Sequence, residues 1–159
     1  MGPQSRVWPI VMVVLGIVGL IMGVVFIYQG VSKSHLLKEA MRVENVALTF
    51  VPGYDKKEII DCAPKAMAAA NVIREHRRKI APTYMDLLGG KKFDPSKHEQ
   101  LDYAQALNLE NYLYFAVVGL GLTQLTTASG VFMVLMGIAI GGTGIRQLKS
   151  ISSVPPGRR

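Results

Sequence analysis

Residues 7–28 have the sequence VWPIVMVVLGIVGLIMGVVFIY, and residues 112–145 have the sequence YLYFAVVGLGLTQLTTASGVFMVLMGIAIGGTGI. Neither stretch contains Asp, Glu, Lys or Arg, whereas the segment between them holds all 11 acidic residues and most of the 18 basic ones. A membrane core about 30 Å thick requires roughly 20 apolar helical residues. The layout therefore predicts a mainly α-helical membrane protein, in which two transmembrane helices bracket a small helical insert.

The first apolar stretch is about 33 Å long as a helix. Trp8 and Tyr28 stand near its two ends, where amphipathic rings favour the membrane interface. A cleaved signal peptide would have a shorter apolar region, of roughly 7–15 residues, and a small-x-small cleavage site. Residues 28–32 (YQGVS) do not supply such a site. We expect a cytoplasmic tail over 1–6 and an uncleaved transmembrane helix over 7–29.

The second apolar stretch is about 51 Å long as a helix, which exceeds one crossing and falls short of two crossings with a turn. Three interpretations fit this length. The helix begins in the aqueous domain and continues into the membrane, or it is strongly tilted, or it breaks near the polar patch 123–129 (TQLTTAS). We favour the first, with one unusually long helix from about 97 to 149, a transmembrane part over 112–146, and a basic cytoplasmic tail over 147–159.

Glycines recur in both stretches, and two pairs have a small-x-x-x-small spacing, Gly19 with Gly23 and Gly137 with Gly141. Such spacings allow helix backbones to approach closely. Six glycines are therefore candidates for helix packing, within the chain or with a partner: Gly16, Gly19, Gly23, Gly130, Gly137 and Gly141.

The insert, 30–111, is expected to be a helical extracytoplasmic domain. About 80 residues support only a marginal core, and Cys62, the single cysteine, cannot form an internal disulfide. A helix over 32–43 should continue from the first apolar stretch. Residues 45–51 (NVALTFV) are β-branched and apolar, which favours either a strand or a lone extended segment packed on helices.

Capping residues predict two further helices in the insert. Asp61 is a candidate cap for a helix running to about 80, and Thr83 for a short helix ending at the glycine pair 89–90. Basic residues crowd the end of the first of these helices, Arg77 among them, where positive charge suits the helix dipole. Glu110, just before the second apolar stretch, is predicted to be a hinge or interface residue near the membrane.

The distribution of positive charge predicts the orientation. Two spans place both tails on one side, and the tails carry Arg6, Arg146, Lys149, Arg158 and Arg159 without an acid. Positive charge beside a span favours the cytoplasm, and long loops contribute little to this rule. Basic residues early in the insert argue the other way. We expect a cell (inner) membrane protein with both termini cytoplasmic and the central domain extracytoplasmic.

No catalytic signature stands out, since the sequence has no nucleophile elbow, phosphate loop or paired cysteines. The chain is therefore expected to be non-catalytic and to need no cofactor. The pairs His35 with Glu39 and His98 with Asp102 have the spacing that places two metal ligands on one helix face. Solvated ion pairs explain that spacing more simply. No basic patch with interleaved aromatic residues indicates nucleic-acid binding.

Two segments of the insert carry a resemblance. One contains Asp61, AAA at 68–70, IREH at 73–76 and PTYM at 82–85, and the other is NLENYLY at 108–114. Together they resemble a pattern in uncharacterised small two-pass bacterial membrane proteins. The resemblance implies the two-pass layout and a location in the bacterial cell envelope, and it brings no activity or site.

These observations predict a non-catalytic structural or accessory subunit of a larger membrane protein complex that packs through its glycine-rich helices. Its expected partners are membrane lipids, together with other membrane subunits or further copies of itself. The alternative is a membrane-anchored extracytoplasmic module that binds or senses a ligand. A metal-dependent enzyme using the two His-carboxylate pairs is the least favoured hypothesis.

Overall fold

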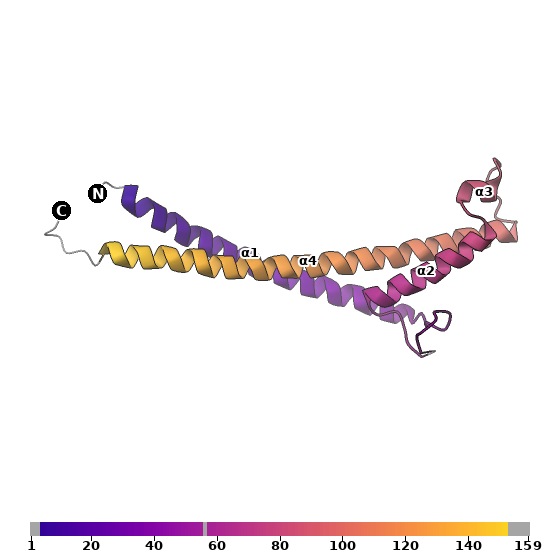
Figure 1. Ribbon diagram of the computed structural model, residues 1–159, viewed down its shortest axis with the longest axis horizontal. Helices are drawn as coiled ribbons and strands as arrows, with labels where there is room; N and C mark the ends of the chain where they lie inside the picture. The colour runs from indigo at the N-terminus through magenta and orange to yellow at the C-terminus, as the bar shows by residue number, and fades with distance from the viewer. Residues whose placement is uncertain (1–3, 56, 153–159) are drawn as a thin grey trace. The chain divides into compact units, whose positions relative to one another are not determined.

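The computed structural model describes residues 4–55 and 57–152, and this part of the chain contains four helices (Figure 1). They are α1 (Gln4–Glu44), α2 (Ala63–Ile80), α3 (Tyr84–Leu88) and α4 (His98–Ser152). The described residues form no strand, so the mainly helical prediction is confirmed. Parts of both predicted tails, 1–3 and 153–159 with Arg158 and Arg159, lie outside the described residues.

Helices α1 and α4 are long enough and apolar enough to cross a membrane, judged by length and composition alone. α1 continues without interruption through 32–43, as predicted. α4 is also continuous, so the interpretation with a break near 123–129 is wrong. The polar side chains of that patch do not end the helix, because a threonine can bond back to its own helix. Thr127, for instance, donates from Oγ1 to the carbonyl of Thr123 at 2.8 Å.

The chain divides into two compact units. The first unit consists of α1 up to Ser32 and α4 from Thr123 onward, and the second runs from Lys33 to Leu122. Both long helices therefore contribute to each unit.

In the first unit, α1 and α4 lie antiparallel with their backbones close together. A Cβ atom added to Gly23 would lie 2.7 Å from the carbonyl oxygen of Gly130, and one added to Gly16 would lie 2.8 Å from that of Gly137. The same close approach recurs at seven-residue steps on both helices. We call these contacts the glycine seam, and its members pair in the order Pro9–Gly144, Gly16–Gly137, Gly23–Gly130 and Gly30–Thr123.

In the second unit, α2 packs an alanine-rich face against a core formed with α4 and the connecting segment. The core contains Leu48, Val51, Ile60, Ala66, Ala69, Ala70, Ile73 and Leu113. Of the segment 45–51, only residues 46–48 are extended, and they pair with 58–60 through one isolated antiparallel bridge between Ala47 and Ile59. Asn45 has a positive φ, and the amide of Val51 donates to the carbonyl of Leu48, so both ends of the segment are turns. The amide of Leu48 donates to Glu58, and that of Ile60 donates to Val46.

The helix caps agree with the sequence in part. Thr83 accepts a hydrogen bond at Oγ1 from the amide of Asp86 and begins α3, and Gly89, in the left-handed conformation, ends it. The predicted cap at Asp61 is wrong. Cys62 occupies the N-cap of α2 without a side-chain bond, because the Asp61 carboxylate turns to the ammonium of Lys65, 3.2 Å away.

Candidate functional site

The most distinctive cluster of polar side chains lies inside the second unit, where Arg77 of α2 meets Glu110 and Tyr103 of α4. The Nε of Arg77 donates to Oε2 of Glu110 at 2.8 Å, and its Nη1 donates to the hydroxyl of Tyr103. All three side chains are buried, with Arg77 only 8% and Glu110 only 5% exposed. We call this cluster the buried ion pair.

Helical spacing explains why Arg77 points inward. Ala66, Ala69, Ala70 and Ile73 form the buried face of α2, and Arg77 is the next position along that face, four residues after Ile73. The guanidinium also lies 4.8 Å from the centre of the Tyr103 ring, which adds a cation–π contact. Tyr84 covers that ring from α3, with the ring centres 6.1 Å apart. The cluster therefore joins three helices.

The surroundings of Arg77 favour its charged form. The hydrogen bond and the negative charge of Glu110 raise the pKa of Arg77 above its ordinary value, although burial acts in the opposite direction. A buried charge without a partner is costly, because desolvation is not offset by any attraction. In the described residues, no buried side-chain nitrogen or oxygen lacks a hydrogen-bond partner.

A second polar contact joins the same two helices. Oδ1 of Asn71 accepts one hydrogen bond from Arg74 at 3.0 Å and another from the hydroxyl of Tyr114 at 3.2 Å. Arg77 contacts Glu110 and Tyr103, whereas Asn71, earlier in α2, contacts Tyr114, later in α4. The two sites of contact fix α2 along α4 in an antiparallel register. These hydrogen bonds hold the two helices together.

The six glycines predicted to pack helices all lie in the first unit, but not in equivalent positions. Gly16, Gly23, Gly130 and Gly137 belong to the glycine seam. Gly19 lies beside it, where an added Cβ would be 3.4 Å from the nearest atom of the facing helix. Gly141 faces Gly16, whose added Cβ would lie 2.6 Å from the Cα of Gly141, but a Cβ added to Gly141 would itself be 3.5 Å from the nearest facing atom. The seam thus follows a spacing of seven rather than four. Gly30 and Gly144 complete it, and the sequence reasoning missed both.

The four candidate metal ligands do not form a metal centre in the described part of the chain. His35 and Glu39 are exposed on α1, and His98 and Asp102 are exposed at the start of α4. Within the described residues, no three His, Cys, Asp or Glu side chains come close enough to hold a metal ion together.

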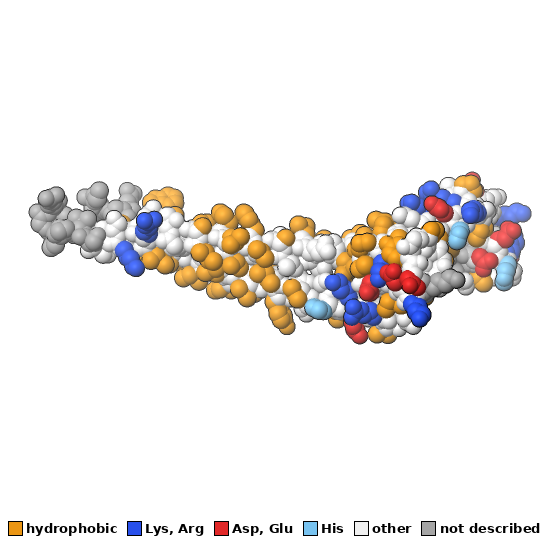
Figure 2. Space-filling view, turned by 60° about the horizontal axis from the view of Figure 1, so that its bottom comes forward, with side chains coloured by type: hydrophobic (Ala, Val, Ile, Leu, Met, Phe, Trp, Pro, Cys, Tyr) orange, Lys and Arg blue, Asp and Glu red, His pale blue; other side chains and the backbone are white. Residues whose placement is uncertain are grey.

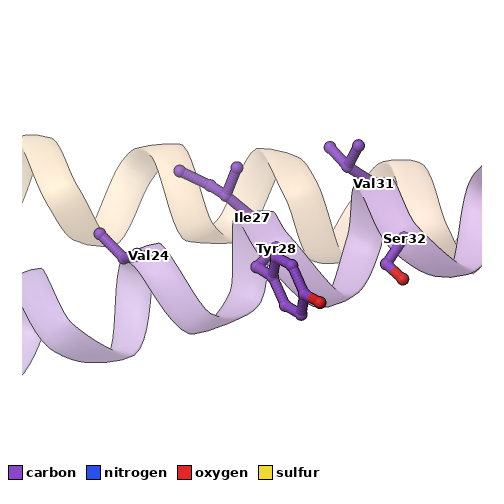
Figure 3. Close-up of a pocket in the computed structure, with 5 residues that line it drawn as sticks. All are labelled: Val24, Ile27, Tyr28, Val31 and Ser32. Carbon is purple, nitrogen blue, oxygen red and sulfur yellow. The ribbon is translucent and has the colours of Figure 1, made fainter.

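The first unit also has an open hollow of about 470 Å³ along α1 (Figure 3). All its lining residues come from that helix: Val24, Ile27, Tyr28, Val31 and Ser32. The lining is apolar apart from the hydroxyls of Tyr28 and Ser32, and it contains no charged group. Nothing in it resembles the convergent polar groups of a substrate pocket.

Comparison with protein-family models, with curated proteins and with solved structures finds no match to this chain. The resemblance of residues 61–85 and 108–114 to small two-pass bacterial membrane proteins therefore remains a prediction.

Proposed function

We propose that the chain is a two-pass membrane protein and acts as a structural or accessory subunit of a larger membrane complex. The first unit is its membrane anchor, and the second is a small domain held at the membrane surface. The observation that carries this proposal is the packing of the first unit, in which small residues are buried and large apolar side chains are exposed.

Among the described residues of the first unit, every buried one is Gly, Pro or Thr. The large apolar side chains point outward instead, with Trp8 74%, Leu125 64% and Val24 61% exposed. Figure 2 shows hydrophobic side chains over this helix pair, and charged side chains mainly over the second unit. Soluble monomers rarely expose contiguous apolar surface of more than a few hundred Å². Lipid chains would cover such a surface without penalty.

The pairing along the glycine seam also indicates which residues of α1 and α4 would lie within the membrane. Because Gly30 faces Thr123 and Pro9 faces Gly144, the first apolar stretch, 7–28, lies level with about 125–146 of α4. Exposed Gln29 and Gln124 stand at one end of this matched segment, and exposed Arg146 stands at the other. A layer about 33 Å thick fits between these polar groups. The transmembrane part of α4 is therefore shorter than the charge-free stretch 112–145.

The geometry of the second unit supports a structural role. Its buried ion pair and its Asn71–Tyr114 contact join α2 to α4 at two places. A rigid, membrane-anchored helical domain suits the holding or spacing of other subunits. Following the positive charge of the tails, we place this domain outside the cytoplasm of a bacterial inner membrane.

Cys62 tests the membrane topology directly, since it is the single cysteine and is partly exposed. Intact cells are treated with a membrane-impermeant maleimide, and the extent of labelling is compared with that in lysed cells. Cys62 should be labelled in intact cells. In the matched control, Cys62→Ser with Ser152→Cys, the thiol should be labelled only after lysis, because Ser152 is exposed at the cytoplasmic end of α4. The reverse pattern would invert the topology, and release of the chain by alkaline carbonate would contradict the anchor.

The accessory role is tested by purifying the full chain in a mild detergent and measuring the native mass of what accompanies it. A stoichiometric complex with other membrane proteins is the expected result. If the chain purifies alone or only with itself, while Cys62 still reports the proposed topology, the anchor stands and the accessory role is wrong.

A further inference from the structure

The hollow along α1 changes in polarity along its length (Figure 3). Its lining residues follow one another at steps of three, one, three and one, which places them on one face of the helix, and all of them belong to the first unit. Val24 and Ile27, at one end, are purely apolar. The two hydroxyls of the lining, on Tyr28 and Ser32, lie from the middle of the hollow onward.

This change in polarity coincides with the edge of the membrane layer proposed above. Tyr28 is the last residue of the first apolar stretch, and exposed Gln29 follows it. Along the helix axis, Val24 lies about 6 Å to the inner side of Tyr28, and Ser32 lies about 6 Å to the outer side. The polar interface of a bilayer extends about 5–7 Å beyond its hydrocarbon core. Val24 therefore lies at the depth of acyl chains, and Ser32 at the depth of headgroups.

A phosphoglycerolipid presents its chemical groups in the same order along the membrane normal. Its acyl chain comes first, the ester carbonyls follow, and the phosphate is outermost. Hydroxyl groups donate hydrogen bonds, and the ester and phosphate oxygens accept them. Tyr28, which is 71% exposed, and Ser32, which is also exposed, can therefore donate to such a lipid.

The size and the openness of the hollow suit a lipid as well. Its volume of about 470 Å³ falls within the range of small-molecule sites, roughly 300–1,000 Å³. Because its lining comes from one helix, the hollow is open on its far side. A soluble ligand would lack a second wall there, whereas a lipid in a bilayer is covered on its free side by neighbouring lipids.

We infer that the hollow binds one phosphoglycerolipid, with an acyl chain against Val24 and Ile27 and with polar oxygens bonded to the hydroxyls of Tyr28 and Ser32. This inference rests on the proposed function, because the depth of each residue follows from the membrane anchor. It deepens that function by assigning one lipid class to one surface of the anchor.

Lipid binding to the purified full chain tests the inference. The chain is stripped of lipid in a mild detergent and titrated with phosphatidylglycerol, and the bound lipids are counted by native mass spectrometry. The first lipid should bind at a lower concentration than the later ones. Addition of every lipid with one common affinity would overturn the inference, because the hollow would then differ in nothing from the rest of the apolar surface.

A pair of matched variants locates the first lipid. Val24→Trp should weaken its binding at least several-fold, because the indole occupies the hollow. Val25→Trp is the control, since Val25 is the neighbouring valine, is also exposed, and does not line the hollow. Equal binding of the first lipid by the two variants would overturn the inference.

A milder variant keeps the test valid even if Val24→Trp fails to fold. Tyr28→Phe retains the ring and removes one donor, so the first lipid should bind about two- to tenfold more weakly, as expected for the loss of one hydrogen bond. Tyr28→Phe combined with Ser32→Ala should bind it more weakly still. Wild-type affinity in this double variant would contradict the assigned hydrogen bonds and overturn the inference.

Cross-linking in native membranes identifies what covers the hollow. A photoreactive p-benzoylphenylalanine placed at Val24 should form an adduct with phospholipid. A protein adduct would overturn the inference, because a partner helix would then cover the hollow. If alkaline carbonate releases the chain, the proposed anchor fails as well. If the chain resists carbonate while Val24→Trp and Val25→Trp bind lipid equally, the anchor stands and only the lipid site is wrong.

Discussion

The glycine seam predicts that chemically identical glycine-to-alanine substitutions differ sharply in their effect on stability. In Gly23→Ala, the new methyl group would lie 2.7 Å from both the carbonyl oxygen of Gly130 and a side-chain carbon of Val134, and 2.9 Å from the amide nitrogen of Val134. Two of these three atoms are backbone, so the facing helix must move as a whole. Gly142→Ala, in the same unit, meets nothing within 4 Å. Both changes gain the same helix propensity of alanine over glycine, and their difference therefore isolates the seam.

The expected magnitude follows from packing. Separating the helices by about 0.5–1 Å forfeits a quarter to a half of each van der Waals contact, and overpacking by one methyl group costs about 1–3 kcal/mol. Gly23→Ala should therefore be less stable than Gly142→Ala by about 1–3 kcal/mol.

The assay is the unfolding of the full chain in mild detergent as sodium dodecyl sulfate is titrated in, followed by circular dichroism. The seam predicts an order of stability as well as a magnitude. Gly16→Ala and Gly130→Ala should resemble Gly23→Ala, whereas Gly141→Ala should be mild, because its added Cβ would lie 3.5 Å from the nearest facing atom. Equal midpoints for Gly23→Ala and Gly142→Ala would refute the close approach of α1 and α4.

Two further predictions concern the second unit. Glu110→Ala should destabilise the chain by about 3–5 kcal/mol, because it leaves Arg77 buried without its counter-charge. The double variant Arg77→Met with Glu110→Leu should recover most of that loss, because it removes both charges. The same unfolding assay measures both variants, and additive losses of stability from the two positions would contradict the pairing. Burial raises the pKa of Asp61, but the hydrogen bond and charge of Lys65 outweigh it, so the pKa lies below its ordinary value. Its stabilising contribution is therefore complete above that ordinary value and is lost as the pH falls through the lowered pKa. Between about pH 5 and pH 3 the wild type should lose more stability than Asp61→Asn, measured as the difference between their unfolding midpoints, and parallel midpoints would show that the ion pair with Lys65 is absent.

The elements that the sequence predicted well are those controlled by local chemistry. The charge-free stretches predicted two long apolar helices, and Thr83 predicted the start of α3, because a hydroxyl at that position can satisfy a free amide. Asp61 failed as a cap because Lys65, four residues later, engages the same carboxylate. Two local interactions compete for one side chain here, and the sequence alone does not rank them.

The spacing of the glycine seam and the position of Arg77 can both be read from the sequence, but other patterns at the same residues favoured different interpretations. The prediction used the four-residue spacing of Gly19 and Gly23 and did not use the seven-residue spacing that includes Gly30. Arg77 lies in a basic run that suits the helix dipole, so its place on the buried face, four residues after Ile73, was overlooked. In both cases the spacing shows which residues share a face, but the partners of that face, Glu110 for Arg77 and Thr123 for Gly30, lie on the other helix and are not given by the spacing.

The alanine face and the buried ion pair of the second unit have complementary roles. Ala66, Ala69 and Ala70 let α2 approach α4 closely, but three methyl groups form a nearly smooth surface. A slide of α2 by one helical turn, about 5.4 Å, would keep much of that apolar contact. The same slide would separate Arg77 from Glu110 and leave two buried charges unpaired, which a marginal core of this size cannot offset. The ion pair therefore sets the register of α2 on α4.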